Sequence, residues 1–317
     1  MNPKTSLTFS VMLLVTLLYG CTAGENATTG INSPFIGGQN AVLVNFIESA
    51  PPSEVFDGKS GTPRETFDVI VNLENVGEFS IPSGKIKANL KGIDPRDFTG
   101  GSRNGRTSVA SSSELRGQSK DSEGNKIESP PVQLGFGTFG YGPNLVGNFQ
   151  TNLRVDICYQ YETRAVGIYC KLSDITEKNG ICDIRGVKKI YNSGAPVQIV
   201  SMTQAPAGSN ELLFTFKVRK LSNSGDVFKP GNQACTGTAE KNRVKVIVET
   251  EEGQNPKCQG LTNGDILFLG SSGEATFTCI QNIGTQRADA EKPVRITLQY
   301  DFLDSKASTL LIKHLGE

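Results

Sequence analysis

The chain contains two copies of one strand-and-turn pattern. The first copy reads Phe67-Asp68-Val69-Ile70-Val71-Asn72-Leu73, then Asn75-Val76-Gly77-Glu78 and Pro82; the second reads Phe214-Thr215-Phe216-Lys217-Val218, then Asn223-Ser224-Gly225-Asp226 and Pro230. In both, an Asn-x-Gly-acid sequence follows a β-branched or aromatic run. Asn and Gly supply the positive φ that a tight turn between twisted strands needs. The pattern therefore predicts a strand that ends in a tight turn in each half.

Two further matches follow in the same order. Near the end of each half, residues 154–161 (Arg-Val-Asp-Ile-Cys-Tyr-Gln-Tyr) align with residues 295–302 (Arg-Ile-Thr-Leu-Gln-Tyr-Asp-Phe). Apolar and polar residues alternate in both, which is typical of a strand with one buried and one wet face. A weaker match pairs Leu43-Val44 with Ile199-Val200. Three ordered matches indicate an internal duplication.

The duplication predicts an all-β protein of two tandem β-sandwich domains, at residues 39–190 and 191–317. Each copy holds about seven strand candidates separated by turns, as a Greek-key sandwich does. The chain has 35 Gly among 317 residues, and no long stretch shows the 3.6-residue apolar period of a helix. A barrel or a jelly roll is the structural alternative.

The turn and a cysteine-containing strand carry a family resemblance. The Asn-x-Gly turn after a β-rich run resembles the cell-adhesion-related immunoglobulin-like domains of prokaryotic surface proteins. The Cys-Tyr-x-Tyr-x-Thr sequence at 158–163, with Cys170 and Cys182 beyond it, is similar to tandem-sandwich surface proteins of small-genome archaea. The resemblance implies two immunoglobulin-like domains in a lipidated protein of an archaeal envelope.

The N-terminal residues indicate export. Residues 7–18 form an apolar run that is too short to span a membrane, which takes about 20 residues, but suits a signal peptide. The run ends in Leu18-Tyr19-Gly20-Cys21, which resembles a lipobox except for Tyr19, where a small residue is usual. We expect a signal peptide at 1–21 with lipidation of Cys21; an ordinary signal peptide is the alternative.

Residues 22–38 are polar and Gly-rich, and they predict a flexible tether. Asn26 lies in an N-x-[ST] sequon, a weak glycosylation signal. The expected location is the extracellular face of the cell membrane, held by the lipid on Cys21, with secretion as the alternative. Lys+Arg and Asp+Glu both number 32, which argues against a nucleic-acid partner. The expected partners are the membrane and other cell-surface or host-cell-surface proteins.

An irregular insertion is expected at about 92–149, because 94–125 is rich in Gly, Ser and charged residues. Glycine then alternates with Phe136, Phe139 and Tyr141. These three rings would form an interaction loop on a mobile surface. In the alternative, the rings fold back over the sandwich edge and the glycines allow the turns.

Six cysteines beyond an export signal favour disulfides. Cys170 and Cys182 bracket a polar loop, and Cys258 and Cys279 bracket a candidate strand pair. Cys158 would compete for Cys170 across a hairpin, and Cys235 has no obvious partner. Three cysteines per half leave either one free thiol in each or one bridge between the halves. By parity, Cys158 is expected on the wet face of its strand.

Motifs for catalysis are absent from the sequence. The single His, His314, is expected to be exposed or to cap the last strand, and no G-x-S-x-G elbow or closely spaced cysteine pair occurs. We therefore expect no metal, no cofactor and no enzymatic activity. The pairs Glu251-Glu252 and Asp301/Asp304 suit acid–base chemistry or Ca²⁺, but solvated turns are the simpler interpretation.

These features predict a non-enzymatic envelope protein that acts as a structural or adhesion module. One alternative is a subunit of a surface filament or lattice that assembles through sandwich edge strands. Another is an extracellular solute- or glycan-binding protein, which would need a deep pocket with convergent polar groups.

Overall fold

The computed structural model describes residues 33–100, 106–176, 180–285 and 288–316. These residues form β-strands joined by turns, with a single 3₁₀ turn at Thr238–Glu240 and no α-helix. The expectation of an all-β chain is thus confirmed. The expected signal peptide, Cys21 and Asn26 lie outside the described residues. Within those ranges, no helix is long and apolar enough to cross a membrane.

Four sheets hold the strands. A four-stranded sheet has the order β1 (Val42–Phe46), β3 (Phe67–Asn75), β9 (Val132–Tyr141) and β5 (Phe98–Gly100). A five-stranded sheet has the order β11 (Gly186–Lys188), β13 (Val197–Gly208), β14 (Glu211–Lys220), β19 (Glu274–Asn282) and β17 (Lys257–Gln259). A small hairpin pairs β7 (Ser119–Lys120) with β8 (Lys126–Ile127).

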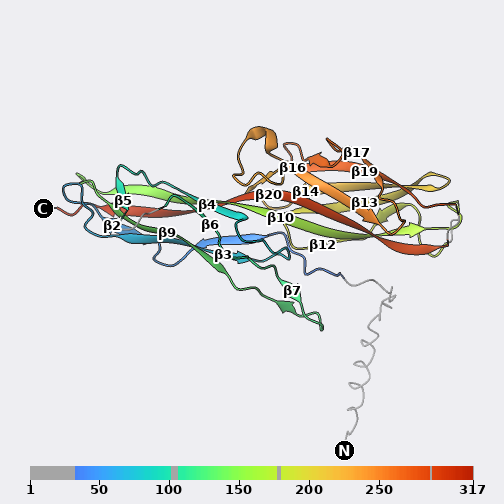
Figure 1. Cartoon of the computed structure of the whole chain (residues 1–317), viewed down its shortest axis with the longest axis horizontal. Helices are drawn as coiled ribbons and strands as arrows, with labels where there is room; N and C mark the ends of the chain where they lie inside the picture. The colour runs from blue at the N-terminus through green and yellow to red at the C-terminus, as the bar shows by residue number, and fades with distance from the viewer. Residues whose placement is uncertain (1–32, 101–105, 177–179, 286–287, 317) are drawn as a thin grey trace, which may run out of the picture. The chain divides into compact units, whose positions relative to one another are not determined.

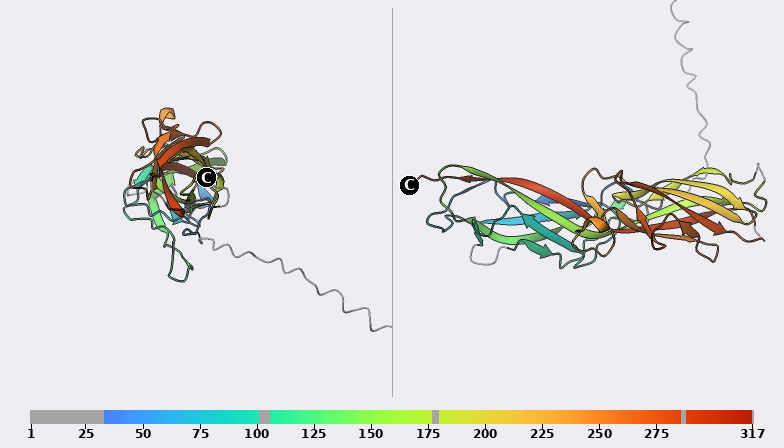
Figure 2. Two further views of the ribbon diagram at one scale, coloured as in Figure 1. Left: turned by 90° about the vertical axis from the view of Figure 1, so that its right-hand side faces the viewer. Right: turned by 90° about the horizontal axis from the view of Figure 1, so that it is seen from above.

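The nine-stranded sheet lies against both the four-stranded and the five-stranded sheet (Figures 1 and 2). Its main path is β18 (Ile266–Phe268), β16 (Arg243–Thr250), β20 (Ala290–Lys313), β10 (Phe149–Lys171), β4 (Ile86–Lys91) and β6 (Ser108–Ala110). Off this path, β12 (Ile190–Asn192) pairs with β10, while β15 (Asp226–Phe228) and β2 (Glu54–Phe56) pair with β20.

Two long strands form the centre of this sheet. β10 and β20 pair antiparallel without a break from Phe149↔Ile312 to Lys171↔Ala290, with Gln160↔Asp301 between. At about 3.3 Å per residue, the 23 residues of β10 span about 76 Å. The strand order on the two sides of this pair is the same, since β4 and β6 flank β10 as β16 and β18 flank β20.

The internal repeat is present in the strand order as well. The order β1-β3-β9-β5 in the first half corresponds to β13-β14-β19-β17 in the second. The repeated early strands are β3 and β14, and the repeated late segments lie in β10 and β20. Because Gln160 and Asp301 are both repeat equivalents and register partners, the two halves are related by an approximate twofold axis at this pair.

The halves exchange the ends of their long strands. Before Asp301, β20 pairs with β16 of the second half; after it, β20 reaches β2 of the first half. β10 passes in the same way from β4 to β12. Residues 34–317 accordingly form one compact unit. The domain boundary expected between residues 190 and 191 does not describe this arrangement. Each half contains the end of a long strand that begins in the other half.

Two expectations about loops need correction. The segment 92–149, expected to be irregular, contains strands β5 to β9. Its apolar residues pair with β3 and contribute to the core. The tether expected at 22–38 is not free at its described end. The backbone N–H groups of Ile36 and Gly37 donate to the carboxylate of Glu78 and hold that end on the fold.

The two repeated glycines pack against repeated aromatic residues. A Cβ on Gly77 would lie 2.0 Å from the Tyr161 hydroxyl, and one on Gly225 would lie 2.5 Å from the Phe302 ring. Tyr161 and Phe302 are equivalent in the sequence repeat. Each glycine is therefore required for the early turn of one half to reach the long strand that crosses it.

We predict that Gly77→Ala and Gly225→Ala each destabilise the protein by about 1–3 kcal/mol, since the added methyl group overpacks a buried ring. Gly225 has a φ of 76°, so Ala there carries backbone strain as well. Gly135→Ala is the matched control, because its Cβ would meet nothing within 4 Å. Urea unfolding followed by circular dichroism measures the three effects. Equal stability of Gly77→Ala and Gly135→Ala would contradict the packing role.

Candidate functional site

The structure does not form the expected interaction loop. Phe136, Phe139 and Tyr141 lie in β9 and are 1%, 2% and 5% exposed. Phe139 packs on Phe67, and Tyr141 packs edge-on against Phe98. The rings are core residues of the first half, so the expectation of a mobile aromatic surface is wrong. The alternation of glycine and aromatic residues is the period of a strand.

The six described cysteines form three disulfides. Cys170 bonds Cys182 and Cys258 bonds Cys279, the two pairings that the sequence favoured. Cys158 bonds Cys235, which had no assigned partner, across a sequence separation of 77. This third bridge joins the two halves, so the competing Cys158–Cys170 pairing is not formed.

Cys158 does not lie on a wet face. Cys158 and Cys235 are 2% and 4% exposed, and with Phe228 and Leu303 they form a small apolar cluster on the outer side of the nine-stranded sheet. Because side chains alternate along β10, Cys158 points to the face of the sheet away from the main core, as expected from the sequence. The segment after β15 then covers that face, which sequence alternation does not reveal.

His314 has a structural partner. Its Nδ1 lies 2.8 Å from the carboxylate of Asp57, whose side chain is fully buried. The hydrogen bond from His314, together with the backbone N–H groups of Leu145 and Leu315, lowers the pKa of Asp57 to about 2. The pair fastens the end of β20 to the turn after β2, and among the residues that the structure describes no nucleophile is hydrogen-bonded to it.

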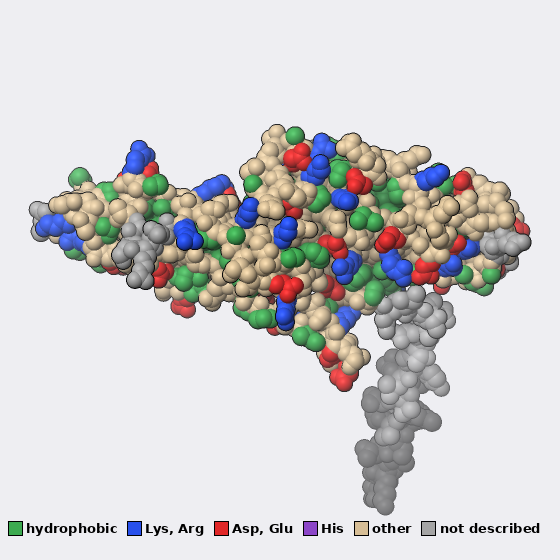
Figure 3. Space-filling view, in the orientation of Figure 1, with side chains coloured by type: hydrophobic (Ala, Val, Ile, Leu, Met, Phe, Trp, Pro, Cys, Tyr) green, Lys and Arg blue, Asp and Glu red, His purple; other side chains and the backbone are tan. Residues whose placement is uncertain are grey.

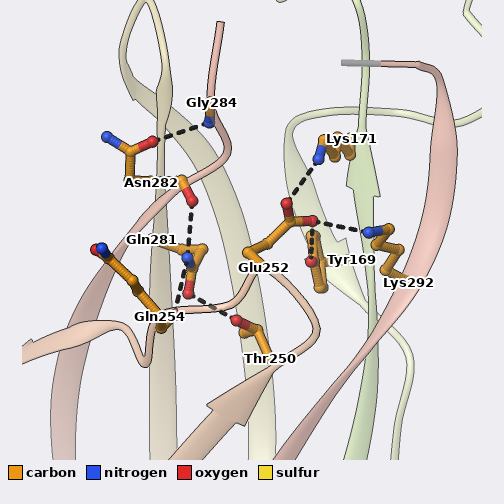
Figure 4. Close-up of polar contacts among 9 residues, drawn as sticks. All are labelled: Tyr169, Lys171, Thr250, Glu252, Gln254, Gln281, Asn282, Gly284 and Lys292. Carbon is orange, nitrogen blue, oxygen red and sulfur yellow. Dashed lines mark hydrogen bonds and ion pairs between the residues drawn. The ribbon is translucent and has the colours of Figure 1, made fainter. Parts of the chain in front are cut away.

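A buried polar cluster surrounds Glu252, at the end of the second half (Figure 4). The Glu252 carboxylate accepts from Lys171 Nζ at 2.6 Å, from Tyr169 Oη at 2.8 Å and from Lys292 Nζ at 3.2 Å. The side chains of Glu252 and Lys171 are only 7% and 10% exposed. Tyr169 and Lys171 extend from β10, Lys292 from β20, and Glu252 follows β16, so the cluster joins three strands.

The electrostatics of this cluster favour the carboxylate. Burial alone would raise the pKa of Glu252, but the hydrogen bonds from Lys171, Tyr169 and Lys292 outweigh it and hold the pKa below its usual value. The pKa of Tyr169 is raised, first by burial and then by the adjacent Glu252. One carboxylate faces two ammonium groups, so the cluster carries a net positive charge.

A shallow depression of about 570 Å³ opens beside this cluster. Lys171, Glu252, Gln254, Asn282 and Gly284 contribute to its lining. Its floor is held by Gln281, which is 1% exposed: this side chain accepts from Thr250 Oγ1 at 2.8 Å and donates to the carbonyl of Asn282 at 2.7 Å. The lining holds one Lys and one Glu that pair with each other, together with the amide groups of Gln254 and Asn282, so it suits uncharged ligands that carry hydroxyl groups. The lining supplies no activated nucleophile.

Sequence reasoning missed the role of Glu252. It treated Glu251-Glu252 as a solvated turn, whereas Glu252 is buried and paired. Asp301, from the other acidic pair, is also buried at 1% exposure, and burial raises its pKa to about 6. Within the described ranges, no group of three or more His, Cys, Asp or Glu side chains is placed to hold a metal ion.

No protein-family model and no curated protein matches this sequence.

We predict that Glu252→Gln destabilises the protein by about 2 kcal/mol at neutral pH, because it leaves Lys171 buried without a counter-charge. The folded-state pKa of Glu252 is lowered, so its stabilisation is present above the unfolded-state value of about 4.3 and is lost as pH falls through the folded value. The difference in unfolding free energy between the wild type and Glu252→Gln should therefore decrease below about pH 4.

Chemical unfolding at pH 7.5 and at pH 3.5 measures this difference. The double variant Glu252→Gln/Lys171→Met is the control, because it removes both buried charges; we expect it to be more stable than Glu252→Gln alone. A destabilisation by Glu252→Gln that is the same at both pH values would contradict the ion-pair role.

Proposed function

We propose that this chain is a non-enzymatic protein of the outer cell surface, anchored by a lipid on Cys21, in which two immunoglobulin-like sandwiches act together as one stiff spacer or adhesion module. The observation that carries the proposal is the unbroken β10–β20 ladder. Two sandwiches joined by a linker would be free to move, as separate domains usually are. Two sandwiches that share a sheet resist bending at their junction.

Covalent bonds support a role outside the cell. Three disulfides fit an extracellular or secreted protein, because such bonds persist in oxidising surroundings. The Cys158–Cys235 bridge further fastens the second half to β10. In the chain-entropy model, closing a loop of this length contributes about 4.5 kcal/mol.

The distribution of charged side chains on the surface does not favour the binding of polyanions such as nucleic acids. In Figure 3, Lys and Arg side chains alternate with Asp and Glu over the face shown, without a large patch of one sign. Several bases are paired with acids on the same strand face, such as Lys217 and Arg219 with Glu274. This distribution supports a protein partner or a spacer role more than nucleic-acid binding.

If the shared ladder makes one mechanical unit, the two halves must unfold together. We predict a single calorimetric transition whose van't Hoff and calorimetric enthalpies agree. The double variant Cys158→Ala/Cys235→Ala should still give one transition, at lower temperature, because the ladder remains. Two resolved transitions in the wild type would contradict the proposal, and two in the variant alone would show that the disulfide provides the coupling.

The anchor is tested separately in cells. We predict that the wild-type chain partitions with membranes and incorporates a radioactive lipid precursor, while Cys21→Ser is released to the medium without label. Asn26→Gln is the control, because it changes the adjacent tether and leaves Cys21 in place. Membrane retention and labelling of Cys21→Ser would argue against a lipid at this residue.

A further inference from the structure

The two halves differ at one place along the shared ladder. In the second half, β12 covers the outer edge of β10, with Ala165↔Asn192 and Gly167↔Ile190 in register. Further backbone hydrogen bonds, from Ile168 N–H to the Lys189 carbonyl and from Ser193 N–H to the Arg164 carbonyl, extend this pairing at both ends. β12 therefore occupies the outer edge of β10 on the second-half side of the twofold axis.

The equivalent edge of β20 is open. Since Gln160 corresponds to Asp301, residues 165–167 of β10 correspond to 306–308 of β20. β15 pairs with β20 only as far as Leu303, and β2 begins to pair at Leu311. No other described residue pairs with this edge between them. Residues 305, 306, 307 and 309 are exposed.

Backbone groups point into this gap. Residues of a strand alternate in the side toward which their N–H and C=O groups point. The Leu311 N–H donates outward to the Ser53 carbonyl, which places the N–H and C=O groups of Ala307 and Thr309 on the same outer side. The N–H of Ser305 is taken by the carboxylate of Asp304.

A second free edge faces the gap. β1 is the last strand of its sheet, and the carbonyl of Ala41 and the N–H of Ile47 bond toward β3, so Val44 and Phe46 present their backbone groups outward. In the second half, the side chain of Asn192 covers the corresponding edge by bonding both backbone groups of Ile199.

A hollow of about 240 Å³ lies where the two free edges meet, with a lining that includes Val44, Asn45, Asp304 and Lys306.

We propose that this gap is a docking slot for one extended β-strand, and that the strand is residues 22–32 of a second copy of this chain. The slot covers residues 304–310, about 23 Å of strand. Because β15 and β2 close its two ends, it admits an extended segment but not the edge of another folded sheet. Main-chain hydrogen bonds from such a segment would complete the sheet.

The length of the remaining chain favours this occupant. The internal stretches outside the described residues, 101–105, 177–179 and 286–287, are five residues or shorter. The N-terminal stretch is long enough, and its residues 22–32 hold a single charge, Glu25. A polar, nearly neutral segment suits an opening whose lining combines one Asp and one Lys with Asn and Ser side chains and apolar residues.

The chain's own tether starts too far away. Gly37 lies beside Asn192 and Gly194, and Asn192 is level with Ala165 and hence with Ile296 of β20. Figure 1 shows the chain before β1 leading away from the first half, toward β12. From Ile296 to Ser305 is nine residues, about 30 Å. Eleven extended residues span about 36 Å, so the return would consume nearly the whole segment.

The inference goes beyond the proposed function and does not depend on the lipid. Its test is a cysteine crosslink between two full-length copies that carry different tags and are expressed together. One copy carries Thr28→Cys, with Ala27→Cys and Thr29→Cys tested in turn to cover the register; the other carries Ala307→Cys. Val187→Cys, at a residue 78% exposed in the second half, replaces Ala307→Cys in the control.

We expect a non-reducing gel to shift both tags together to the mass of a dimer with Ala307→Cys and not with Val187→Cys. Deletion of residues 22–32 should also abolish self-association in sedimentation experiments. A crosslink within one copy that carries both cysteines, without a dimer, would overturn the proposal in favour of the chain's own tether. Absence of any crosslink, or a crosslink of Ala307→Cys to a different protein, would overturn it as well. Surface labelling of the same cells reports localisation independently.

Discussion

The register of β10 against β20 is the constraint on which the rest of the structure depends. Side chains alternate between the faces of a strand, so a slip of one residue would turn the core-facing side chains of the slipped strand outward in both halves. Four rings lie at the crossing, Tyr159, Tyr161, Tyr300 and Phe302, with centroids 5.8 to 6.3 Å apart. Tyr159 and Tyr161 are the repeat equivalents of Tyr300 and Phe302. One aromatic cluster thus serves both halves and fixes the register.

Local signals in the sequence were sufficient for the long repeated strands. The alternation in 154–161 and 295–302 depends on neighbouring residues, and β10 and β20 contain these segments as predicted. The positive φ expected in the Asn-x-Gly turns is present at Gly225, with 76°, but not at Gly77. The repeat also indicated which strands are equivalent. It did not indicate that the late strands exchange halves, because equivalence leaves open whether the end of a strand packs on its own half or on the other.

The site residues show the same limit. The partner of Cys158 lies 77 residues away, in a segment whose path no local pattern describes. Glu252 looked like part of a solvated turn because its ion-pair partners, Lys171 and Lys292, come from strands distant in the sequence. Two interpretations of Phe136 were open for a different reason: glycine suggested a mobile surface loop, although its alternation with aromatic residues already had the period of a strand.

The exchange of strand ends has a consequence for how this chain can change through recombination. In most tandem proteins, a cut between repeats yields two transferable modules. Here a cut near residue 190 would separate residues 302–313 from the first half, where they pair with β10 and β2, and would leave the second half without the end of β10. Insertion, loss or shuffling of a single repeat would therefore break the sheet that the two halves share.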